Sequence, residues 1–135
     1  MSVRDIKKIG TYVTIAIALG IAIYFFVFYQ SVTDVKDVKV DGYVYDATTK
    51  KPINDATVVI NNERYVSDKG RSNFDEYLGH DIITLRTDKS GHYSTVIKKS
   101  AFLWIDFEKQ GYQNASIDGQ YSTKMMVFTT YMKKP

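Results

Sequence analysis

The strongest pattern in the chain is an apolar run over residues 9–29, which contains no charged residue and no Asn, Gln or Pro. In a helix of this sequence, apolar side chains lie on every side. The helix would therefore lack the polar stripe of one that packs against a soluble core. It would be about 30 Å long, close to the thickness of the hydrocarbon core of a bilayer. The run predicts one transmembrane helix.

Charged residues flank this run unequally. Arg4, Lys7 and Lys8 precede it with only Asp5 against them, whereas the lysines that follow it are balanced by aspartates. By the positive-inside rule, residues 1–8 stay in the cytoplasm and the chain after about residue 30 is exported. We expect a single-pass protein of a bacterial inner (cytoplasmic) membrane, with its C-terminal domain in the periplasm or outside the cell.

A cleaved signal peptide is the alternative for this segment, because it also combines a basic start with an apolar run. Three features favour a retained anchor. The run is longer than the roughly 7–15 residues of a typical signal-peptide core, no A-x-A-like cleavage site follows it, and no cysteine is present to carry a lipid.

Beyond a short polar linker over residues 30–37, the pattern changes to the alternation of β-strands. In residues 38–45, Val40 and Val44 share one face with other small apolar residues, and Tyr43 and Tyr45 share the other. Further strand-forming segments follow at residues 56–60, 82–86, 92–97, 102–108, 112–117 and 124–132. Turn formers separate these segments, including the Asn pair at 61–62 and residues 118–122. About seven short strands with regular turns predict an all-β sandwich over residues 38–135.

Two segments stand out from this pattern. Residues 64–81 contain glycines and aspartates that break any period, together with apolar side chains. We expect an elaborated loop there, with room for a short helix over residues 73–78. In residues 124–132 both faces of the strand are apolar, which predicts either a central strand or one that a partner covers.

Composition excludes several classes of function. The formal net charge is +3 for 135 residues, and the basic residues before the apolar run account for most of it. The exported part is therefore close to neutral and lacks the basic footprint of a nucleic-acid-binding domain. The absence of cysteine excludes disulfides and thiol chemistry.

Four short motifs occur along the chain in the same order as in a known family. They are the V-x-G-x-V-x-D run ending at Asp46, the K-P-I turn at residues 51–53, the T-D-x-x-G-x-Y turn ending at Tyr93, and the L-x-I-x-F strand followed by Gly111 and Tyr112. This order resembles the carboxypeptidase regulatory-like domain over nearly all of residues 38–132. The resemblance implies a seven-stranded Greek-key, transthyretin-like (prealbumin-like) β-sandwich. It also implies a domain that is usually non-catalytic and accompanies enzymes, transporters and surface proteins. The stretch 64–81 is longer than the connection usual in that family.

Catalytic and metal-binding patterns are weak. His80 lies near Asp75, Glu76 and Asp81, but solvated loop residues explain this grouping better than a metal site. Residues 68–76 lack the spacing of a calcium loop, and neither His80 nor His92 accompanies a nucleophile motif. We therefore expect no enzyme activity, no metal and no cofactor.

Aromatic residues are the remaining signal. Tyr43 and Tyr45 should face outward on one strand, and Phe102 and Trp104 on another, so that together they would form an apolar interface if both strands belong to one sheet. The alternative is that these rings are scattered or covered by residues 64–81. The candidate interaction residues are Tyr43, Tyr45, Phe74, Tyr77, Phe102 and Trp104.

Three functions follow as hypotheses. The first is a non-enzymatic, membrane-anchored scaffold that docks onto other membrane or envelope proteins, as an oligomer within a larger complex such as a secretion machine. In this hypothesis residues 9–29 contact the lipid bilayer and no nucleic acid is bound. The second is a module that binds glycan or peptide at the cell envelope, and the third is a regulatory subunit of an envelope peptidase.

Overall fold

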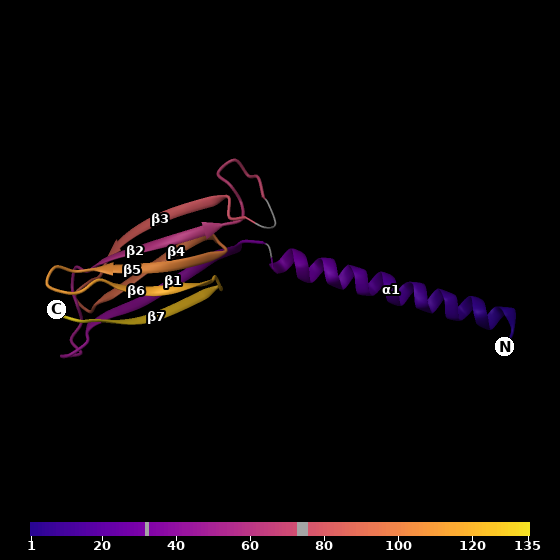
Figure 1. Cartoon of the computed structure of the whole chain (residues 1–135), viewed down its shortest axis with the longest axis horizontal. Helices are drawn as coiled ribbons and strands as arrows, with labels where there is room; N and C mark the ends of the chain where they lie inside the picture. Colours follow the sequence, from indigo (N-terminus) through magenta and orange to yellow (C-terminus); the bar gives the residue numbers. More distant parts are fainter. Residues whose placement is uncertain (32, 73–75) are drawn as a thin grey trace. The chain divides into compact units, whose positions relative to one another are not determined.

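The computed structural model describes residues 1–31, 33–72 and 76–135. The chain forms two compact units, Met1–Thr33 and Asp34–Pro135. The first unit is a helix and the second is a β-sandwich (Figure 1).

The first unit is helix α1, Val3–Ser31, which begins before the predicted span and extends beyond it. Ser2 caps its start in a reciprocal arrangement: the backbone N–H of Asp5 donates to the Ser2 hydroxyl oxygen at 3.4 Å, and the backbone N–H of Ser2 donates to Asp5 Oδ2 at 3.1 Å. Within the apolar run, the Thr14 hydroxyl donates to Gly10 O at 2.9 Å, which satisfies the hydroxyl within the helix itself. The helix is long and apolar enough to cross a membrane, as an anchor or as a signal sequence.

The second unit contains seven strands in two sheets (Figure 1). The strands are β1 Val35–Asp46, β2 Thr57–Arg64, β3 Gly79–Arg86, β4 His92–Ser100, β5 Phe102–Glu108, β6 Ala115–Tyr121 and β7 Met125–Met132. One sheet has the order β4-β1-β7 and the other β3-β2-β5-β6. All pairs are antiparallel except β1 and β7, which are parallel. The predicted β-sandwich behind an apolar helix is therefore confirmed. Because β1 begins at Val35, the stretch predicted as a linker over residues 30–37 is taken up largely by the end of α1 and the start of β1.

The core lies between the two sheets and comes from the alternating inward positions of the strands. Its fully buried large side chains are Phe107, Ile60, Leu103, Ile105, Met132, Val38, Val40, Val44 and Val58. Gly42 makes room within this core for Tyr93, since a Cβ at position 42 would lie 2.4 Å from the Cζ of the Tyr93 ring. Tyr93 is accordingly 2% exposed.

Three local predictions need correction. Asn61 and Asn62 do not form a turn, because β2 continues through them to Arg64. Asn62 is buried, and its Nδ2 donates to Asp81 Oδ2 at 3.1 Å and to Lys99 O at 2.9 Å. These two acceptors take the place of the water that would bond the amide in an exposed turn. Residues 118–121 belong to β6 instead of a turn, since β6 pairs with β5 as far as Tyr121. Strand β7 is an edge strand beside β1, which excludes the central position; cover by a partner, the other alternative, stays a prediction.

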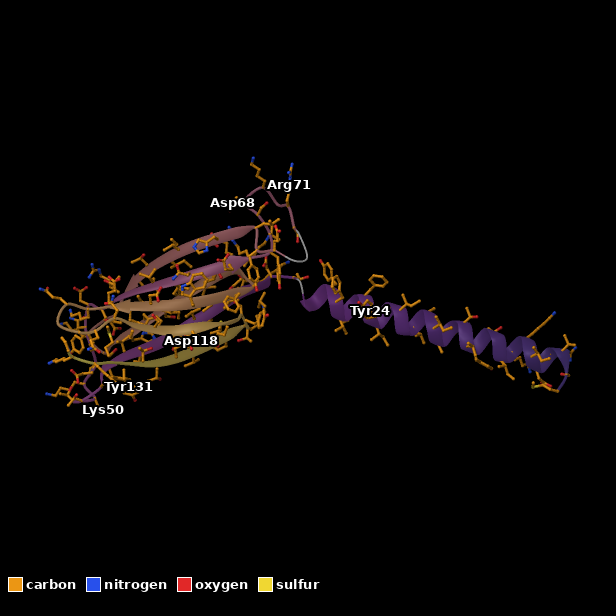
Figure 2. The ribbon with its side chains drawn as sticks, in the orientation of Figure 1. Tyr24, Lys50, Asp68, Arg71, Asp118 and Tyr131 are labelled. Atoms are coloured by element: carbon orange, nitrogen blue, oxygen red, sulfur yellow. The ribbon has the colours of Figure 1, made fainter. Side chains whose placement is uncertain are left out.

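The two ends of the sandwich carry different side chains. Lys50 and Tyr131 lie at one end, whereas Asp68 and Arg71 lie at the other, on the connection between β2 and β3 (Figure 2). The second end is also where the chain enters the sandwich. There the buried Asp34 carboxylate accepts hydrogen bonds from the backbone N–H groups of Tyr65 and Val66, at 2.7 and 3.3 Å.

Candidate functional site

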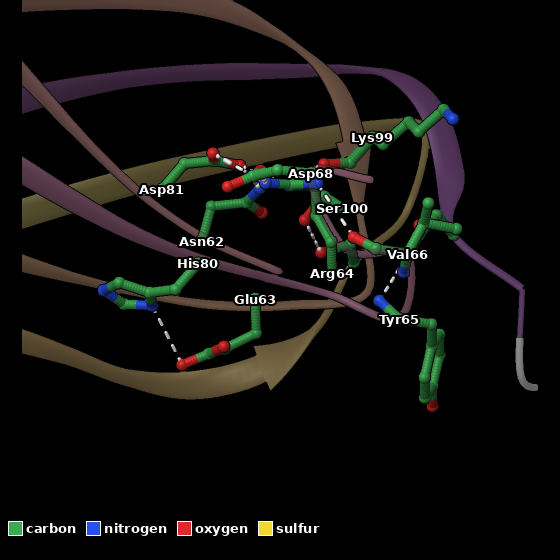
Figure 3. A network of polar contacts seen from close by, with 12 residues as sticks. Asn62, Glu63, Arg64, Tyr65, Val66, Asp68, His80, Asp81, Lys99 and Ser100 are labelled. Carbon is green, nitrogen blue, oxygen red and sulfur yellow. Dashed lines mark hydrogen bonds and ion pairs between the residues drawn. The ribbon is translucent and has the colours of Figure 1, made fainter. Parts of the chain in front are cut away.

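Arg64, the last residue of β2, is the centre of a polar network (Figure 3). Its Nε donates to Asp81 Oδ2 at 2.7 Å and its Nη2 to Asp81 Oδ1 at 3.1 Å. The same Nη2 donates to Asp68 Oδ1 at 2.7 Å, and Nη1 donates to Val66 O at 2.8 Å. The Arg64 side chain is only 12% exposed. The hydrogen bond with Asp81, followed by that with Asp68, raises the pKa of Arg64, so the guanidinium is permanently charged and already paired.

The local sequence makes this arrangement feasible. Gly79 opens β3 directly beside Arg64, and a Cβ there would lie 2.6 Å from Arg64 Cζ and 2.5 Å from Val66 O. Downstream of Val66, a tight turn is closed by the Ser67 N–H donating to Arg71 O at 2.7 Å, with Gly70 at a φ of 77°. The described part of the stretch 64–81 is therefore an ordered hairpin tied to β3. A short helix was expected over residues 73–78. Positions 73–75, which include the candidate Phe74, lie outside the described residues. Positions 76–78 are not helical.

A groove of about 450 Å³ lies beside this network. It runs between β3 and β4, which are edge strands of different sheets, so no strand closes the sandwich there. Its apolar lining is Ile83, Val96 and Ile97, and its polar lining is Arg64, Asp81, Lys98 and Lys99. Val96 is 60% exposed. The groove therefore presents an apolar floor to solvent.

The cations on the rim of the groove differ in their pairing. Arg64 is neutralised by Asp81 and Asp68. Lys98 and Lys99 are exposed and make no ion pair with any residue that the structure describes. Two lysines without an ion pair among these residues thus line the groove together with its apolar side chains. Residue-by-residue interpretation of the sequence missed this site, because its lining comes from the edges of two sheets that only the fold brings together.

The candidate aromatic residues do not form one surface. Tyr43 and Tyr45 lie on the outer face of β1, with ring centroids 6.0 Å apart and nearly parallel planes. Phe102 and Trp104 lie on β5, which belongs to the other sheet. The two pairs therefore occupy opposite outer faces of the sandwich. The expected four-ring interface would require β1 and β5 in one sheet, and the topology separates them.

Each pair instead joins other rings on its own sheet. Tyr45 lies 5.8 Å from Tyr131 of β7, and Tyr43 lies 4.9 Å from the ring of His92. On the opposite face, Phe102 lies 6.1 Å from Tyr77, as a stacked pair.

Two further ring contacts lie on the same face. Trp104 lies 6.0 Å from the ring of His80, and Tyr77 lies 5.1 Å from the ring of Tyr65. Burial, followed by the neighbouring Tyr65, raises the pKa of Tyr77 to about 12, so its phenol is neutral at physiological pH.

The histidines are engaged in separate pairs. His80 Nδ1 lies 3.0 Å from Glu63 Oε1, and His92 Nε2 bonds with Asp41. Asp81, considered from sequence as a metal ligand beside His80, bonds instead with Arg64. Within residues 1–31, 33–72 and 76–135, no group of three or more His, Asp or Glu side chains is arranged to hold a metal ion.

These features define the chain as a single β-sandwich domain behind an apolar helix. No family model and no curated protein matches the sequence. Solved structures do share the fold. A 3-chlorocatechol 1,2-dioxygenase from Rhodococcus opacus 1CP has a TM-score of 0.52 at 14% identity, over 76% of this chain and 61% of that one. A hydroxyquinol 1,2-dioxygenase from Pseudomonas putida DLL-E4 has a TM-score of 0.52 at 13% identity, over 77% and 58%. A catechol 1,2-dioxygenase from Acinetobacter radioresistens has a TM-score of 0.52 at 13% identity, over 75% and 53%.

These comparisons correct the function predicted from the sequence. We expected a non-enzymatic scaffold, with a glycan- or peptide-binding module or a peptidase subunit as alternatives. The three structures named above are enzymes, so the prediction that the chain is not an enzyme was wrong: the usually non-catalytic character of the resembled family does not hold for this fold. At 13–14% identity the likeness shows the fold alone. The chain also spans only between about half and three-fifths of the length of these enzymes.

Proposed function

We propose that the chain is a membrane-anchored β-sandwich that binds an acidic amphiphile in the groove between β3 and β4. An acidic phospholipid, with an anionic head and apolar tails, is the ligand of this class that a membrane supplies. In this proposal α1 is a retained anchor in a bacterial inner membrane, with its N-terminus in the cytoplasm. The observation that carries the proposal is an apolar groove with two unpaired lysines at its rim.

The apolar floor supports the tail of such a ligand. Val96 is 60% exposed, and Ile83 is partly buried against the core. Covering this surface with an acyl chain would remove it from water, at about 25 cal/mol per Å² of apolar area. The volume of about 450 Å³ falls within the range of roughly 300–1,000 Å³ that small-molecule sites have.

The rim supports the anionic head. Lys98 and Lys99 lack anionic partners among the described residues, whereas the charge of Arg64 is already used by Asp81 and Asp68. A lysine close to an anionic lipid contributes about 1 kcal/mol. The two lysines together would then favour an anionic over a zwitterionic head group by about 2 kcal/mol, or roughly 30-fold.

The test uses the full chain in nanodiscs of phosphatidylcholine, to which phosphatidylglycerol is added in steps. The measurement is the NMR shift of the isoleucine methyl groups of Ile83 and Ile97. We expect these signals to move with the phosphatidylglycerol fraction, while Ile105, which is fully buried in the core, stays unchanged.

Two pairs of variants separate head-group from tail recognition. Lys98→Gln with Lys99→Gln should weaken the response roughly 30-fold, whereas Lys133→Gln with Lys134→Gln, an equal change outside the groove, should leave it intact. Val96→Thr should weaken it, and Val127→Thr, which changes a similarly exposed valine on β7, should not. Ile83 and Ile97 signals that ignore phosphatidylglycerol would exclude the proposal.

The finer structural class is part of the same proposal. The sandwich order, together with the motifs at Asp46, Tyr93 and Tyr112, supports placing the domain among transthyretin-like, carboxypeptidase regulatory-like Greek-key sandwiches. Binding to other envelope proteins and assembly into an oligomer stay predictions from the sequence.

A further inference from the structure

A row of four aromatic side chains crosses the outer face of the four-stranded sheet at one end. The tyrosine row consists of Tyr65, Tyr77, Phe102 and Tyr121. Neighbouring ring centroids in the row are 5.1, 6.1 and 5.5 Å apart. Tyr121 is 73% exposed and Tyr77 is 39% exposed. The row is therefore held together by its own ring contacts, while Tyr77 and Tyr121 stay exposed to solvent.

This row lies at the end of the sandwich where the chain enters. The Asp34 carboxylate accepts a hydrogen bond from the backbone N–H of Tyr65 at 2.7 Å, so the entry point is joined directly to the backbone of the first residue of the row. Helix α1 ends at Ser31, three residues before Asp34. Three residues span at most about 11 Å. Chain length alone therefore keeps this end of the sandwich close to the point where an inserted α1 would leave the bilayer.

The chemistry of this end suits a lipid surface. Tyrosine is enriched at membrane–water interfaces, because its ring enters the head-group layer while its hydroxyl stays hydrated. Lys69 and Arg71 are exposed on the turn that follows Val66, and neither makes an ion pair with a described residue. Figure 2 shows Arg71 at the outer end of that connection. These cations are complementary to phospholipid phosphates.

We propose that the tyrosine row is a membrane-contact surface, with Tyr77 and Tyr121 in the phospholipid head-group layer and Lys69 and Arg71 against phosphates. The proposal rests on the membrane anchor of the proposed function but not on the groove. It predicts that the sandwich is seated on the bilayer in one orientation and does not tumble freely at the end of its tether.

The absence of cysteine allows a direct test, because a single introduced cysteine can carry a fluorophore. The full chain is reconstituted in phosphatidylcholine nanodiscs that contain a lipid with a nitroxide on its head group. The fluorophore is placed at Thr123→Cys, in the turn between β6 and β7 near the row, or at Lys89→Cys, in the turn at the other end. We expect strong quenching at position 123 and none at position 89. Equal quenching at both positions would overturn the proposal.

Replacing tyrosines of the row shows whether the row itself contacts lipid or whether the tether alone keeps the sandwich near the bilayer. Tyr121→Ser, at a highly exposed position, should lower the quenching at position 123, and adding Tyr77→Ser should reduce it to the level at position 89. Tyr131→Ser, on β7 of the other sheet, is the matched control and should have no effect. Quenching that persists in the folded row variants would show that the tether alone holds the sandwich near lipid, and would refute contact by the row. The measurement needs no acidic lipid, so its failure is distinct from failure of the groove.

Discussion

Gly79→Ala tests whether the Arg64 network holds the connection between β2 and β3 in place. The new methyl group would lie 2.5 Å from Val66 O and 2.6 Å from Arg64 Cζ, closer than side chains approach such atoms. The φ of Gly79 is not in the left-handed region, so alanine itself is compatible with the backbone. At such a position Gly→Ala ordinarily stabilises by about 0.4–1 kcal/mol. A large loss would therefore report displacement of the guanidinium together with the Val66 carbonyl that it binds.

The magnitude follows from the contacts that Arg64 would lose. Hydrogen bonds with a charged partner contribute about 1.5–3 kcal/mol each. The Asp81 side chain is 40% exposed and that of Asp68 is 89% exposed. Solvent therefore screens both ion pairs with Arg64 and reduces the stabilisation that they contribute, and the Asp68 pair adds little. We expect a loss of about 2–3 kcal/mol. For a domain of this size that lowers the Tm by about 10–20 °C.

The assay is thermal unfolding of the full chain in detergent, followed by circular dichroism of the β signal. The control is Gly111→Ala, whose methyl group would meet no atom within 4 Å but whose φ is 86°. That control carries only a backbone cost of about 1–2 kcal/mol. If Gly79→Ala destabilises no more than Gly111→Ala, the Arg64 network does not organise this end of the sandwich.

Three further substitutions test the turns and caps. Thr87→Val removes a buried hydroxyl that accepts from one backbone N–H at 2.8 Å and donates to a carbonyl at 2.7 Å, and should cost about 1–3 kcal/mol in urea unfolding. Gly91→Ala forces a φ of 73° and a contact of 2.4 Å with a carbonyl oxygen, so the variant should be less stable than Thr87→Val in the same assay. The backbone N–H of Thr49, then the hydroxyl of Tyr112, lower the pKa of Asp46 to about 2. Because this pKa is depressed, the stabilisation by Asp46 is present above about pH 4 and is lost as the pH falls towards 2. Asp46→Asn should therefore lower the Tm at pH 7, and the difference in Tm from wild type should disappear near pH 2. A difference in Tm that stays constant with pH would contradict stabilisation by the ionised Asp46 carboxylate.

The fold by itself does not select a function. Solved structures that share it at low identity are dioxygenases, and that likeness shows the fold alone. What the chain adds to the fold is an apolar helix at one end, a groove with unpaired lysines and the tyrosine row. The apolar helix and the tyrosine row both support the proposed contact with a lipid surface. The groove supports a lipid ligand independently, because of its lysines and its apolar lining.

The amino-acid sequence by itself determined the elements whose signal is local. The unbroken apolar run specifies α1, because a helix of that composition can bury its surface only in lipid or in a larger core. Alternation in β1 placed Val40 and Val44 inward and Tyr43 and Tyr45 outward, because the side-chain period of a strand is two.

Tertiary structure decided everything that depends on which strands become neighbours. Alternation states which side chains share a face of a strand but not which sheet the strand joins, so the Tyr43 and Phe102 pairs fell on opposite faces of the molecule. The Asn pair at 61–62 favours a turn by residue type, but the amide of Asn62 finds its partners, Asp81 and Lys99 O, on β3 and β4. The groove arises in the same way. Its apolar floor and its lysines belong to edge strands of two sheets, and no local pattern records that two sheet edges will lie side by side.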